Sequence, residues 1–477
     1  MNNIVNIFKD KIKESDIEDS IDLAYYFGEF LFYNELPFFD VSLIEEYLIE
    51  RVTQKNNSFC FQEFENKGDL FLVTQPYITG GHTRLMENLS LMIDSEKHLL
   101  ITRGADNFTK QRLGAYFSQI NTLYRSRDEE STEYVNRLVK ELVNYNRLIL
   151  NIHPEDIFSV IACGIAKKLK NSLKVFFVNH ADHAFTYGAS VADFWFEISL
   201  YGREVDKLRN IKGEKTFIGI PINKPDSIFF DRVEYPKLDN ATNFISAASY
   251  VKYKPCRKSK IFPLLYMILT EKSNSSIKII GVNIFKNYWW WIPKLRFCKR
   301  LITYRSLPYD DYIRATSEAD YYIDSYPMPG GTAFVEQFIQ GIPCIGLKSD
   351  FFGYTPLECV KKKSCAEVID MLRNPPRQDE IISIQERIFS VHGFSQVKKR
   401  FVGAIDTGEI YSNPMIEYIE DTGIRDFHKK RFTFSARSLI FLYKLDRIFF
   451  LKSLFLAKPL SIIKMSFFAV YQYVKYR

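Results

Sequence analysis

Short apolar runs alternate with segments of helical pattern along most of the chain, and this alternation limits the folds open to it. The first series begins at Asp69, and its expected strands are 70–74, 98–102, 148–152, 175–179, 194–198 and 215–222. Strands that alternate with helices form a parallel sheet with helices on both faces. We therefore expect a doubly wound, Rossmann-like α/β domain over residues 67–225.

The same alternation returns after Pro221 and Pro225, which mark a linker. The expected strands are 244–248, 277–282, 302–304, 321–324 and 343–347, with helices at 261–270, 310–317 and 332–339. A second doubly wound domain is thus predicted over residues 226–405. In such open sheets ligands bind beyond the carboxyl ends of the strands, so the two domains should face each other across a cleft.

Two helical segments flank this pair of domains. Residues 1–66 carry apolar side chains at three- and four-residue spacing, which predicts an N-terminal helical extension. Residues 406–477 form the second flank, expected to be a helical tail rich in basic and aromatic residues. A length of 477 residues agrees with more than one domain.

The positive charge of the chain is concentrated in the tail. Residues 425–477 hold twelve Lys or Arg and two Asp, a net charge of +10, whereas the whole chain carries +7 and the remainder therefore about −3. Basic-aromatic helices lie on anionic membrane surfaces; the alternative is a tail packed against the domains. A slightly acidic body does not favour nucleic acid as a partner.

The cysteines and the apolar runs bear on the compartment. The seven cysteines are scattered without a C-x-x-C pair, which argues against a disulfide framework or a structural zinc site. The sequence has no apolar run of the roughly 18 residues that a spanning helix needs, and its start does not resemble a signal peptide. We expect a cytoplasmic protein, in solution or peripheral on the inner face of the membrane.

The most informative motif follows the predicted strand 321–324. Gly330 and Gly331 allow the backbone to approach a ligand closely, and Thr332 opens a helix whose N–H groups and dipole suit a diphosphate. Glu336 lies one turn along that helix, where a carboxylate can accept both hydroxyls of a ribose. The plain alternative is a tight turn in which Thr332 caps the helix.

This segment resembles the donor-binding segment of GT-B glycosyltransferases, and among them the O-linked N-acetylglucosamine transferases and their bacterial N-glycosyltransferase relatives. Residues 323–325, 329–333, Glu336 and 341–343 match the family pattern in order, although Gly331-Thr332-Ala333 replaces its His-Thr-Thr element. The resemblance implies a GT-B fold and a UDP-sugar as co-substrate. No Asp-x-Asp sequence is present, so we expect no metal ion and no other cofactor.

A second match to this family lies upstream. The family has a Tyr-Lys-x-x-Pro segment whose lysine holds the donor diphosphate, and residues 250–255 read Tyr-Val-Lys-Tyr-Lys-Pro here. Lys252 stands three residues before the proline, so the resemblance assigns it to donor binding. Lys254 is the spare candidate.

In the first domain, a glycine pair and two basic side chains follow the first strand. Gly80 and Gly81 let the chain approach the donor, and Arg84 can neutralise a leaving diphosphate. A neutral His82 suits the removal of a proton from an attacking hydroxyl. The alternative is that His82 caps the helix that begins at Thr83.

Histidines and an aspartate also follow later strands. For Asp182 and His183 we expect a catalytic role, and for His180 and His153 contact with the acceptor, because such clusters at strand ends indicate sites. A structural hydrogen-bond cluster is the alternative. Neighbouring residues on one loop rarely converge on one ion, so a metal site is not favoured.

Together these features predict an enzyme, a hexosyl- or N-acetylhexosaminyltransferase, that moves sugar from a nucleotide sugar to a glycan, a lipid-linked saccharide or a protein. Two alternatives remain. A nucleotide-sugar epimerase or hydrolase would use the same site without an acceptor. A catalytically silent sugar-binding partner subunit would keep Gly330, Gly331 and Glu336 but would not need His82 or Asp182.

Overall fold

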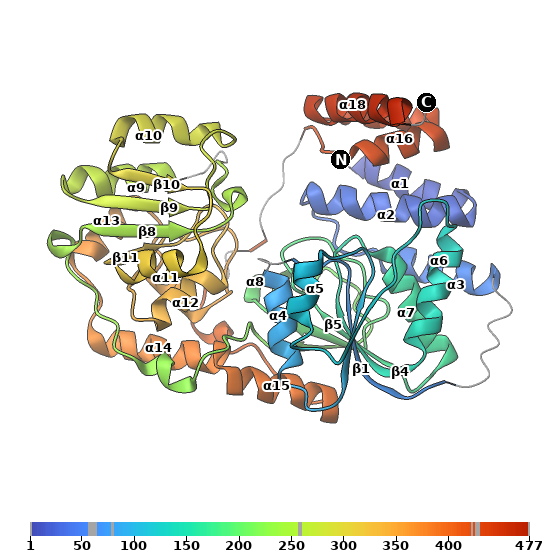
Figure 1. Ribbon diagram of the computed structural model, residues 1–477, viewed down its shortest axis with the longest axis horizontal. Coiled ribbons are helices and arrows are strands. Elements are labelled where there is room, and N and C mark those ends of the chain that lie inside the picture. Colours follow the sequence, from blue (N-terminus) through green and yellow to red (C-terminus); the bar gives the residue numbers. More distant parts are fainter. Residues whose placement is uncertain are drawn as a thin grey trace.

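The computed structural model describes residues 2–55, 64–77, 81–255, 260–420, 423–424 and 430–475. Two parallel β-sheets, each with helices packed on it, lie side by side, and helices of the two chain ends stack above the first sheet (Figure 1). The predicted α/β architecture with two doubly wound domains is therefore confirmed.

The first sheet has the order β3-β2-β1-β4-β5-β6-β7, with all pairs parallel. Its strands are β1 (Lys67–Val73), β2 (Lys97–Ile101), β3 (Gln119–Thr122), β4 (Tyr145–Asn151), β5 (Lys174–Val178), β6 (Phe194–Glu197) and β7 (Glu214–Phe217). Its helices are α4 (Gly81–Ser90), α5 (Asn107–Leu113), α6 (Ser131–Leu142), α7 (Ile157–Leu169) and α8 (Leu200–Asp206). The chain order reverses at β1 and β4, which makes the topological switch point of this sheet.

The second sheet has the order β10-β9-β8-β11-β12 and is also parallel. Its strands are β8 (Asn243–Ala247), β9 (Ser276–Ile280), β10 (Leu301–Tyr304), β11 (Tyr321–Ile323) and β12 (Cys344–Ile345). Its helices are α9 (Ile261–Glu271), α10 (Trp291–Phe297), α11 (Tyr309–Ser317), α12 (Thr332–Ile339), α13 (Cys365–Arg373) and α14 (Gln378–His392). Here the switch point lies between β8 and β11.

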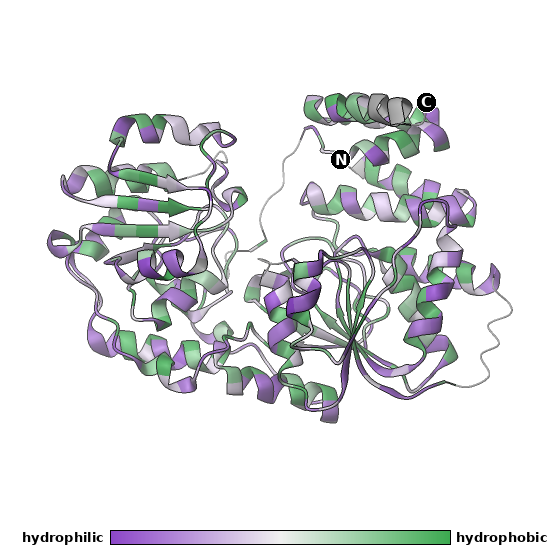
Figure 2. Ribbon diagram, viewed as in Figure 1, coloured by the Kyte–Doolittle hydropathy of each residue, from purple (hydrophilic) through white to green (hydrophobic). Residues whose placement is uncertain are grey.

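The central strands are apolar on both faces because both faces are covered. In β1, Leu70 and Leu72 belong to the core shared with the terminal helices, whereas Phe71 and Val73 belong to the core on the opposite face. Successive side chains of a strand point to opposite sides, so a continuous apolar run specifies a strand buried twice. In the second sheet the strands are mostly hydrophobic but are interrupted by polar residues such as Lys278 of β9, as the purple bands in Figure 2 show.

The N-terminal helices are part of the first domain. These helices are α1 (Asn2–Glu14), α2 (Ile17–Tyr33) and α3 (Ser42–Lys55), and their apolar faces share one core with β1, β4 and α7. From α3 the fully buried Glu45 accepts hydrogen bonds from the Gly188 and Ser190 N–H groups, both at 2.9 Å, and from the Ser190 hydroxyl. Such a satisfied buried carboxylate fixes the extension in one position.

The chain crosses between domains twice. After α14 on the second domain, α15 (Phe394–Thr407) returns to the first, where Val397 and Phe401 pack with Phe71. From α15, Arg400 donates to the Ile218 carbonyl at 3.0 Å, which joins this helix to the end of β7. The first domain is thus completed by residues that follow the second.

The basic tail forms α16 (Ala436–Leu445), α17 (Arg447–Leu456) and α18 (Pro459–Lys475), and it packs on the N-terminal helices. Its inner face is buried: the Phe449 ring meets Phe8 edge-on at 4.8 Å, and Phe434 lies 5.0 Å from Phe30. The packing alternative therefore holds for this inner face, while other apolar side chains of the tail remain exposed. Within the described ranges, no helix has both the length and the apolar character needed to cross a bilayer.

The tail core yields a stability prediction. Phe449 is 1% exposed, so Phe449→Ala should lower the free energy of unfolding by about 3–5 kcal/mol. Phe455 on the same helix is 84% exposed, so Phe455→Ala should change it by less than about 0.5 kcal/mol. Chemical denaturation of both variants makes the comparison. Equal stability of the two would show that the tail does not rest on α1 and α2.

Candidate functional site

A cleft of about 520 Å³ lies between the two domains and is lined by residues of both. It brings together side chains and backbone from loops that follow β1, β5, β8 and β11. The lining residues that the sequence also singled out are Gly81, His82, Arg84, His180, His183, Lys252, Gly330, Gly331, Thr332 and Glu336. Gly80 lies outside the described residues, and Asp182 and His153 lie behind the cleft wall.

Sheet topology explains this convergence. In the first domain the loop after β1 stands at the switch point, and in the second the loops after β8 and β11 do so. Helices that leave a switch point go to opposite faces of the sheet, which opens a crevice at the carboxyl ends of the strands. Each domain presents such a crevice, and the cleft joins the two.

Asp324, at the end of β11, shapes the loop that precedes α12. Its Oδ1 accepts from the N–H groups of Ser325 at 2.8 Å and Gly330 at 2.7 Å. Its Oδ2 lies 2.7 Å from the Lys361 Nζ, and both side chains are almost completely buried. A buried ion pair with such backbone bonds is costly to disrupt. Asp324 therefore fixes the loop rather than contacting a ligand.

The two glycines of this loop are required for different reasons. A Cβ on Gly330 would lie 2.6 Å from the Asp324 Oδ1, so a side chain there would displace the carboxylate. Gly331 has φ 57° and ψ −115°, a conformation that is open essentially to glycine alone. A Cβ on Gly331 would meet no atom within 4 Å, since this residue borders the cleft.

Helix α12 presents its N-terminus to the cleft. In the described part of the chain no side chain caps this helix, and its first turn holds no acidic residue. Gly331, Thr332 and Ala333 all line the cleft, so the first N–H groups and the positive end of the helix dipole border it. The turn-and-cap alternative for Thr332 gains no support from this arrangement, which suits an anion.

Glu336 follows one turn along α12 and also lines the cleft. Burial raises the pKa of its carboxyl group, while the charges of Arg84 and Lys224, from the first domain and the linker, oppose the rise. Burial and these two charges are the causes of the shift, and no hydrogen bond from a described residue to the oxygens of Glu336 is among them. These oxygens remain available to hydroxyl groups of a ligand.

Lys252 lies beside the same loop, on the short turn after β8. Its Nζ donates to the Pro329 carbonyl at 2.8 Å, and it lines the cleft. Burial lowers the pKa of Lys252, an effect that the nearby Asp324 carboxylate offsets in part. The ammonium is thus held next to the N-terminus of α12, where a second positive group would face an anion.

On the first-domain side, four rings pack together. His82 stacks on His180 at 5.3 Å, meets His153 edge-on at 5.7 Å and meets Tyr77 edge-on at 5.3 Å. These rings come from loops after β1, β4 and β5, which are neighbours in the sheet. Across the described residues, no group of three or more His, Cys, Asp or Glu side chains is arranged to hold a metal ion.

His82 is a neutral imidazole. Burial lowers its pKa to about 4. Its Nε2 lies 3.1 Å from the Gln75 carbonyl, which can only accept a hydrogen bond. Nε2 therefore carries the proton, and Nδ1 keeps a free lone pair. The alternative role of helix cap does not match these contacts, because the hydrogen bonds of the ring go to Gln75 and Thr83.

Asp182 lies under the cleft and is fully buried. It accepts from the Tyr354 hydroxyl at 2.7 Å and from the Ser199 hydroxyl. Tyr354 belongs to the second domain and lines the cleft. Its hydrogen bond to Asp182 therefore links the two domains behind the cleft wall. Its neighbour His183 does reach the cleft, where its ring meets Phe351 edge-on at 5.5 Å.

His153 is held outside the cleft by charged neighbours. Its Nδ1 lies 3.3 Å from the Arg103 guanidinium, which also pairs with Glu155 at 3.0 Å. Burial opposes ionisation of Glu155, but hydrogen bonding from His153 and the charge of Arg103 prevail and lower its pKa to about 2. His153 reaches the cleft only through its contact with the His82 ring.

Sequence reasoning missed three contributors from the second domain. Phe351 and Tyr354 line the cleft, yet they stand on a loop after β12 that has no recognisable motif. Lys361, the partner of Asp324, was equally invisible. A buried lysine has no signature of its own in a sequence, although its spacing of three from Glu358 puts the two charges 4.0 Å apart here.

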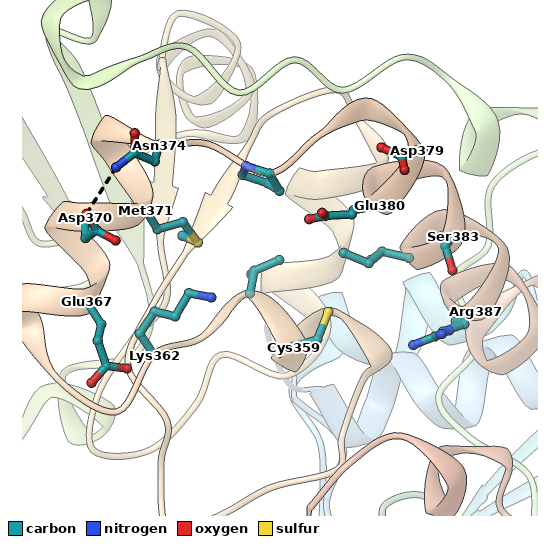
Figure 3. Close-up of a pocket in the computed structure, with 13 residues that line it drawn as sticks. Cys359, Lys362, Glu367, Asp370, Met371, Asn374, Asp379, Glu380, Ser383 and Arg387 are labelled. Carbon is teal, nitrogen blue, oxygen red and sulfur yellow. Dashed lines mark hydrogen bonds between the residues drawn. The ribbon is translucent and has the colours of Figure 1, made fainter.

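A second hollow, of about 700 Å³, lies in the second domain between α13, α14 and the short 3₁₀ helix η5 (Pro356–Val360) (Figure 3). Its labelled side chains carry charges of both signs, such as Lys362 and Arg387 beside Glu367, Asp370 and Glu380. No residue that the sequence singled out lines it. Its described lining includes no glycine, and the first turns of α13 and α14 that border it carry acidic residues, Glu367 in one and Asp379 and Glu380 in the other.

No protein-family model matches the sequence, and no curated protein is detectably similar to it. Solved structures do match the fold. The Anabaena protein Alr3699/HepE in complex with UDP-glucose has a TM-score of 0.53 and 13% identity, covering 71% of this chain and 99% of its own. An O-GlcNAc transferase of Thermobaculum terrenum has a TM-score of 0.51 and 12% identity, covering 85% of each chain. The chain thus has the GT-B fold and resembles the O-GlcNAc transferase group in its architecture.

The backbone of the loop before α12 can be tested by substitution. Gly331→Ala forces a Cβ into φ 57° and should destabilise the second domain by about 1–3 kcal/mol. Gly81→Ala is the control, because a Cβ there meets no atom within 4 Å and its φ is ordinary. Thermal unfolding of the two variants measures the difference. A Gly331→Ala protein as stable as Gly81→Ala would mean that the loop adopts another conformation.

Proposed function

We propose that this protein is a glycosyltransferase that takes a sugar from a nucleotide diphosphate sugar, most suitably a UDP-sugar. The observation that carries the proposal is the uncapped N-terminus of α12, one turn before Glu336, in the cleft of a GT-B fold. It is supported by HepE, a protein of the same fold that was solved with UDP-glucose and with UDP and glucose.

The donor is proposed to lie along the second-domain wall of the cleft. Its diphosphate would accept from the N–H groups at Gly331, Thr332 and Ala333, and Lys252 would neutralise it from the side. Glu336 would accept from the ribose hydroxyls, since its oxygens are free. Arg84, whose positive charge acts on Glu336 from the first domain, would neutralise the negative charge of the leaving diphosphate.

His82 is the proposed catalytic base. The acceptor hydroxyl would attack the anomeric carbon, the bond from that carbon to the diphosphate oxygen would break, and the proton would pass to the free Nδ1 of His82. A pKa of about 4 makes the ring a weak base. A bound diphosphate would raise that pKa, because an anion nearby favours the imidazolium. UDP then leaves with the electron pair of the broken bond.

We propose that the remaining residues either position other side chains of the site or contact the acceptor. Asp182 positions the Tyr354 hydroxyl and the loop that bears His183, because its oxygens bond within the protein. His183 and His180 line the cleft on the first-domain wall, where an acceptor would enter, and His153 supports the His82 ring from behind.

The acceptor is proposed to be a glycan, a lipid-linked saccharide or a protein, and the enzyme to be cytoplasmic. The tail would hold it at the inner face of the membrane, in keeping with polysaccharide biosynthesis, since its exposed face bears Lys452 and Lys464 beside apolar side chains.

A screen of nucleotide sugars for binding, hydrolysis and transfer separates the alternatives. Epimerisation or hydrolysis of the nucleotide sugar without an acceptor would favour an epimerase or a hydrolase. Binding of the nucleotide sugar without turnover would favour a catalytically silent sugar-binding subunit.

Glu336→Ala tests the donor site. Loss of the charge-assisted hydrogen bonds to ribose should weaken UDP binding by about 1.5–3 kcal/mol, a roughly ten- to hundredfold rise in Kd. Glu386→Ala, at an exposed position of α14, is the matched control and should leave Kd unchanged. Calorimetric titration with UDP reports both. Equal affinities of the two variants would remove Glu336 from the site.

His82→Ala tests the catalytic role. Turnover should fall by roughly a hundredfold or more, with little change in the Kd for UDP. Because its folded pKa is about 4, His82 is already a free base above pH 5. Protonation of His82 should therefore cause no loss of wild-type kcat/KM as the pH falls through 6.5. It should lower kcat/KM only as the pH approaches 4. A variant with normal turnover would assign the proton transfer to another group, with His183 next to be tested.

A further inference from the structure

An exposed apolar surface on the second domain has no part in the cleft. It is built by residues 283–300, which include α10, and we call it the tryptophan surface because this segment contains three of the four tryptophans of the chain, the exposed Trp291, the half-buried Trp289 and the buried Trp290. Phe285, Ile292 and Leu295 are 74–89% exposed. Tyr288 and Trp291 are also more than half exposed. Large apolar side chains gathered in this way mark an interaction site.

The tryptophan surface is fixed to the domain. Trp290 is fully buried and meets Phe262 edge-on at 5.0 Å, and Pro293 is buried beside it. The Trp291 Nε1 donates to the Ile284 carbonyl at 2.7 Å, which holds the exposed ring in place. The apolar side chains between these anchors are therefore held outward by the fold.

The charge around this surface has one sign. Residues 272–309 contain no Asp or Glu but eight Lys or Arg. Among them Lys286, Arg296 and Lys299 are exposed beside the aromatic and aliphatic side chains. Tryptophan and tyrosine favour the interface of a bilayer, and each basic residue adds attraction to anionic headgroups.

The tail repeats this chemistry on the first domain. In α17 the residues Ile448, Leu451 and Phe455 are at least half exposed, and in α18 Leu460, Ile463 and Phe467 are so too. Both sets have the spacing i, i+3, i+7, which places them on one side of each helix. Lys452 and Lys464 stand at i+4 in the two stripes. The buried Phe449 and Ser461 lie on the inner sides of these helices.

The tryptophan surface and the tail lie at the same edge of the molecule. Figure 1 shows α10 and α18 together at the top of the view, above separate domains, with α14 and α15 at the opposite edge. We propose that both surfaces bind one anionic bilayer, so that each domain has its own membrane contact. A broad planar partner with negative headgroups can meet two separated surfaces at once. The proposal rests on these surfaces and not on the sugar chemistry.

The test is flotation of the full-length chain with vesicles of phosphatidylcholine, with or without phosphatidylglycerol. The wild type should float with the anionic vesicles only, and binding should fall as salt rises because exposed charges are screened. Trp291→Glu with Ile292→Glu and Leu295→Glu should reduce binding by about tenfold or more, as each loses apolar contact and adds repulsion. Ile448→Glu with Leu451→Glu and Phe455→Glu should have a similar effect.

The control is Ile382→Glu with Lys399→Glu, on α14 and α15 at the opposite edge, which should float like the wild type. Unchanged thermal unfolding and UDP affinity of each variant show that the fold and the cleft are intact. Tryptophan emission adds a direct readout, because Trp195 and Trp290 are fully buried while Trp291 is exposed. Anionic vesicles should shift it to the blue in the wild type and less so in Trp291→Phe, which keeps only the half-buried Trp289 outside the core.

Two results would overturn the proposal. Equal flotation of the Trp291, Ile292 and Leu295 variant and the wild type would confine membrane contact to the tail. Absence of flotation for the wild type, with self-association that this variant abolishes, would assign the tryptophan surface to a second copy of the chain. Neither result would contradict the proposal that the cleft binds a nucleotide sugar, because UDP affinity is measured separately on the same proteins.

Discussion

The buried ion pair between Asp324 and Lys361 is the interaction on which the arrangement of the cleft depends. One oxygen of Asp324 accepts from the N–H groups of Ser325 and Gly330, and the other pairs with Lys361 at 2.7 Å. Lys361 also lies over the Phe334 ring of α12 at 4.8 Å. A charge so deeply buried is tolerated only with such partners. The pair therefore fixes the glycine loop and the start of α12 together.

The rest of the site follows from this fixed loop and from the two switch points. With the loop in place, the α12 N-terminus, Lys252 and Glu336 form one wall of the cleft, positive where the helix begins and negative one turn later. The opposite wall supplies neutral imidazoles, because burial lowers the pKa of His82 to about 4 and lowers that of His180 well below its ordinary value. One wall thus suits an anionic ligand, and neutral imidazoles face it from the other.

Much of this could be read from the sequence. The two series of apolar runs alternating with helical segments predicted both sheets, because strands that are buried on both faces are apolar throughout. The short edge strand β3 (Gln119–Thr122) escaped notice, since it is polar and only one of its edges is paired. The glycine loop was visible because its conformation demands glycine, and Glu336 because helical spacing ties it to Thr332.

What the sequence did not reveal depends on contacts between distant segments. The cluster of His and Asp at the end of β5 predicted a catalytic role for Asp182, and the structure places its carboxylate behind the cleft wall, bonded to Tyr354 from the other domain. For the basic tail the sequence left two alternatives open, contact with a membrane surface and packing on the domains, and the structure shows that its inner face shares a core with the N-terminal helices.

The central claim is that the cleft holds a nucleoside diphosphate at the start of α12. A crystal structure of the full-length chain with UDP tests it most directly. The account predicts the diphosphate against the N–H groups of Gly331, Thr332 and Ala333 and the ribose on Glu336. A UDP bound elsewhere, with the α12 N-terminus vacant, would contradict it.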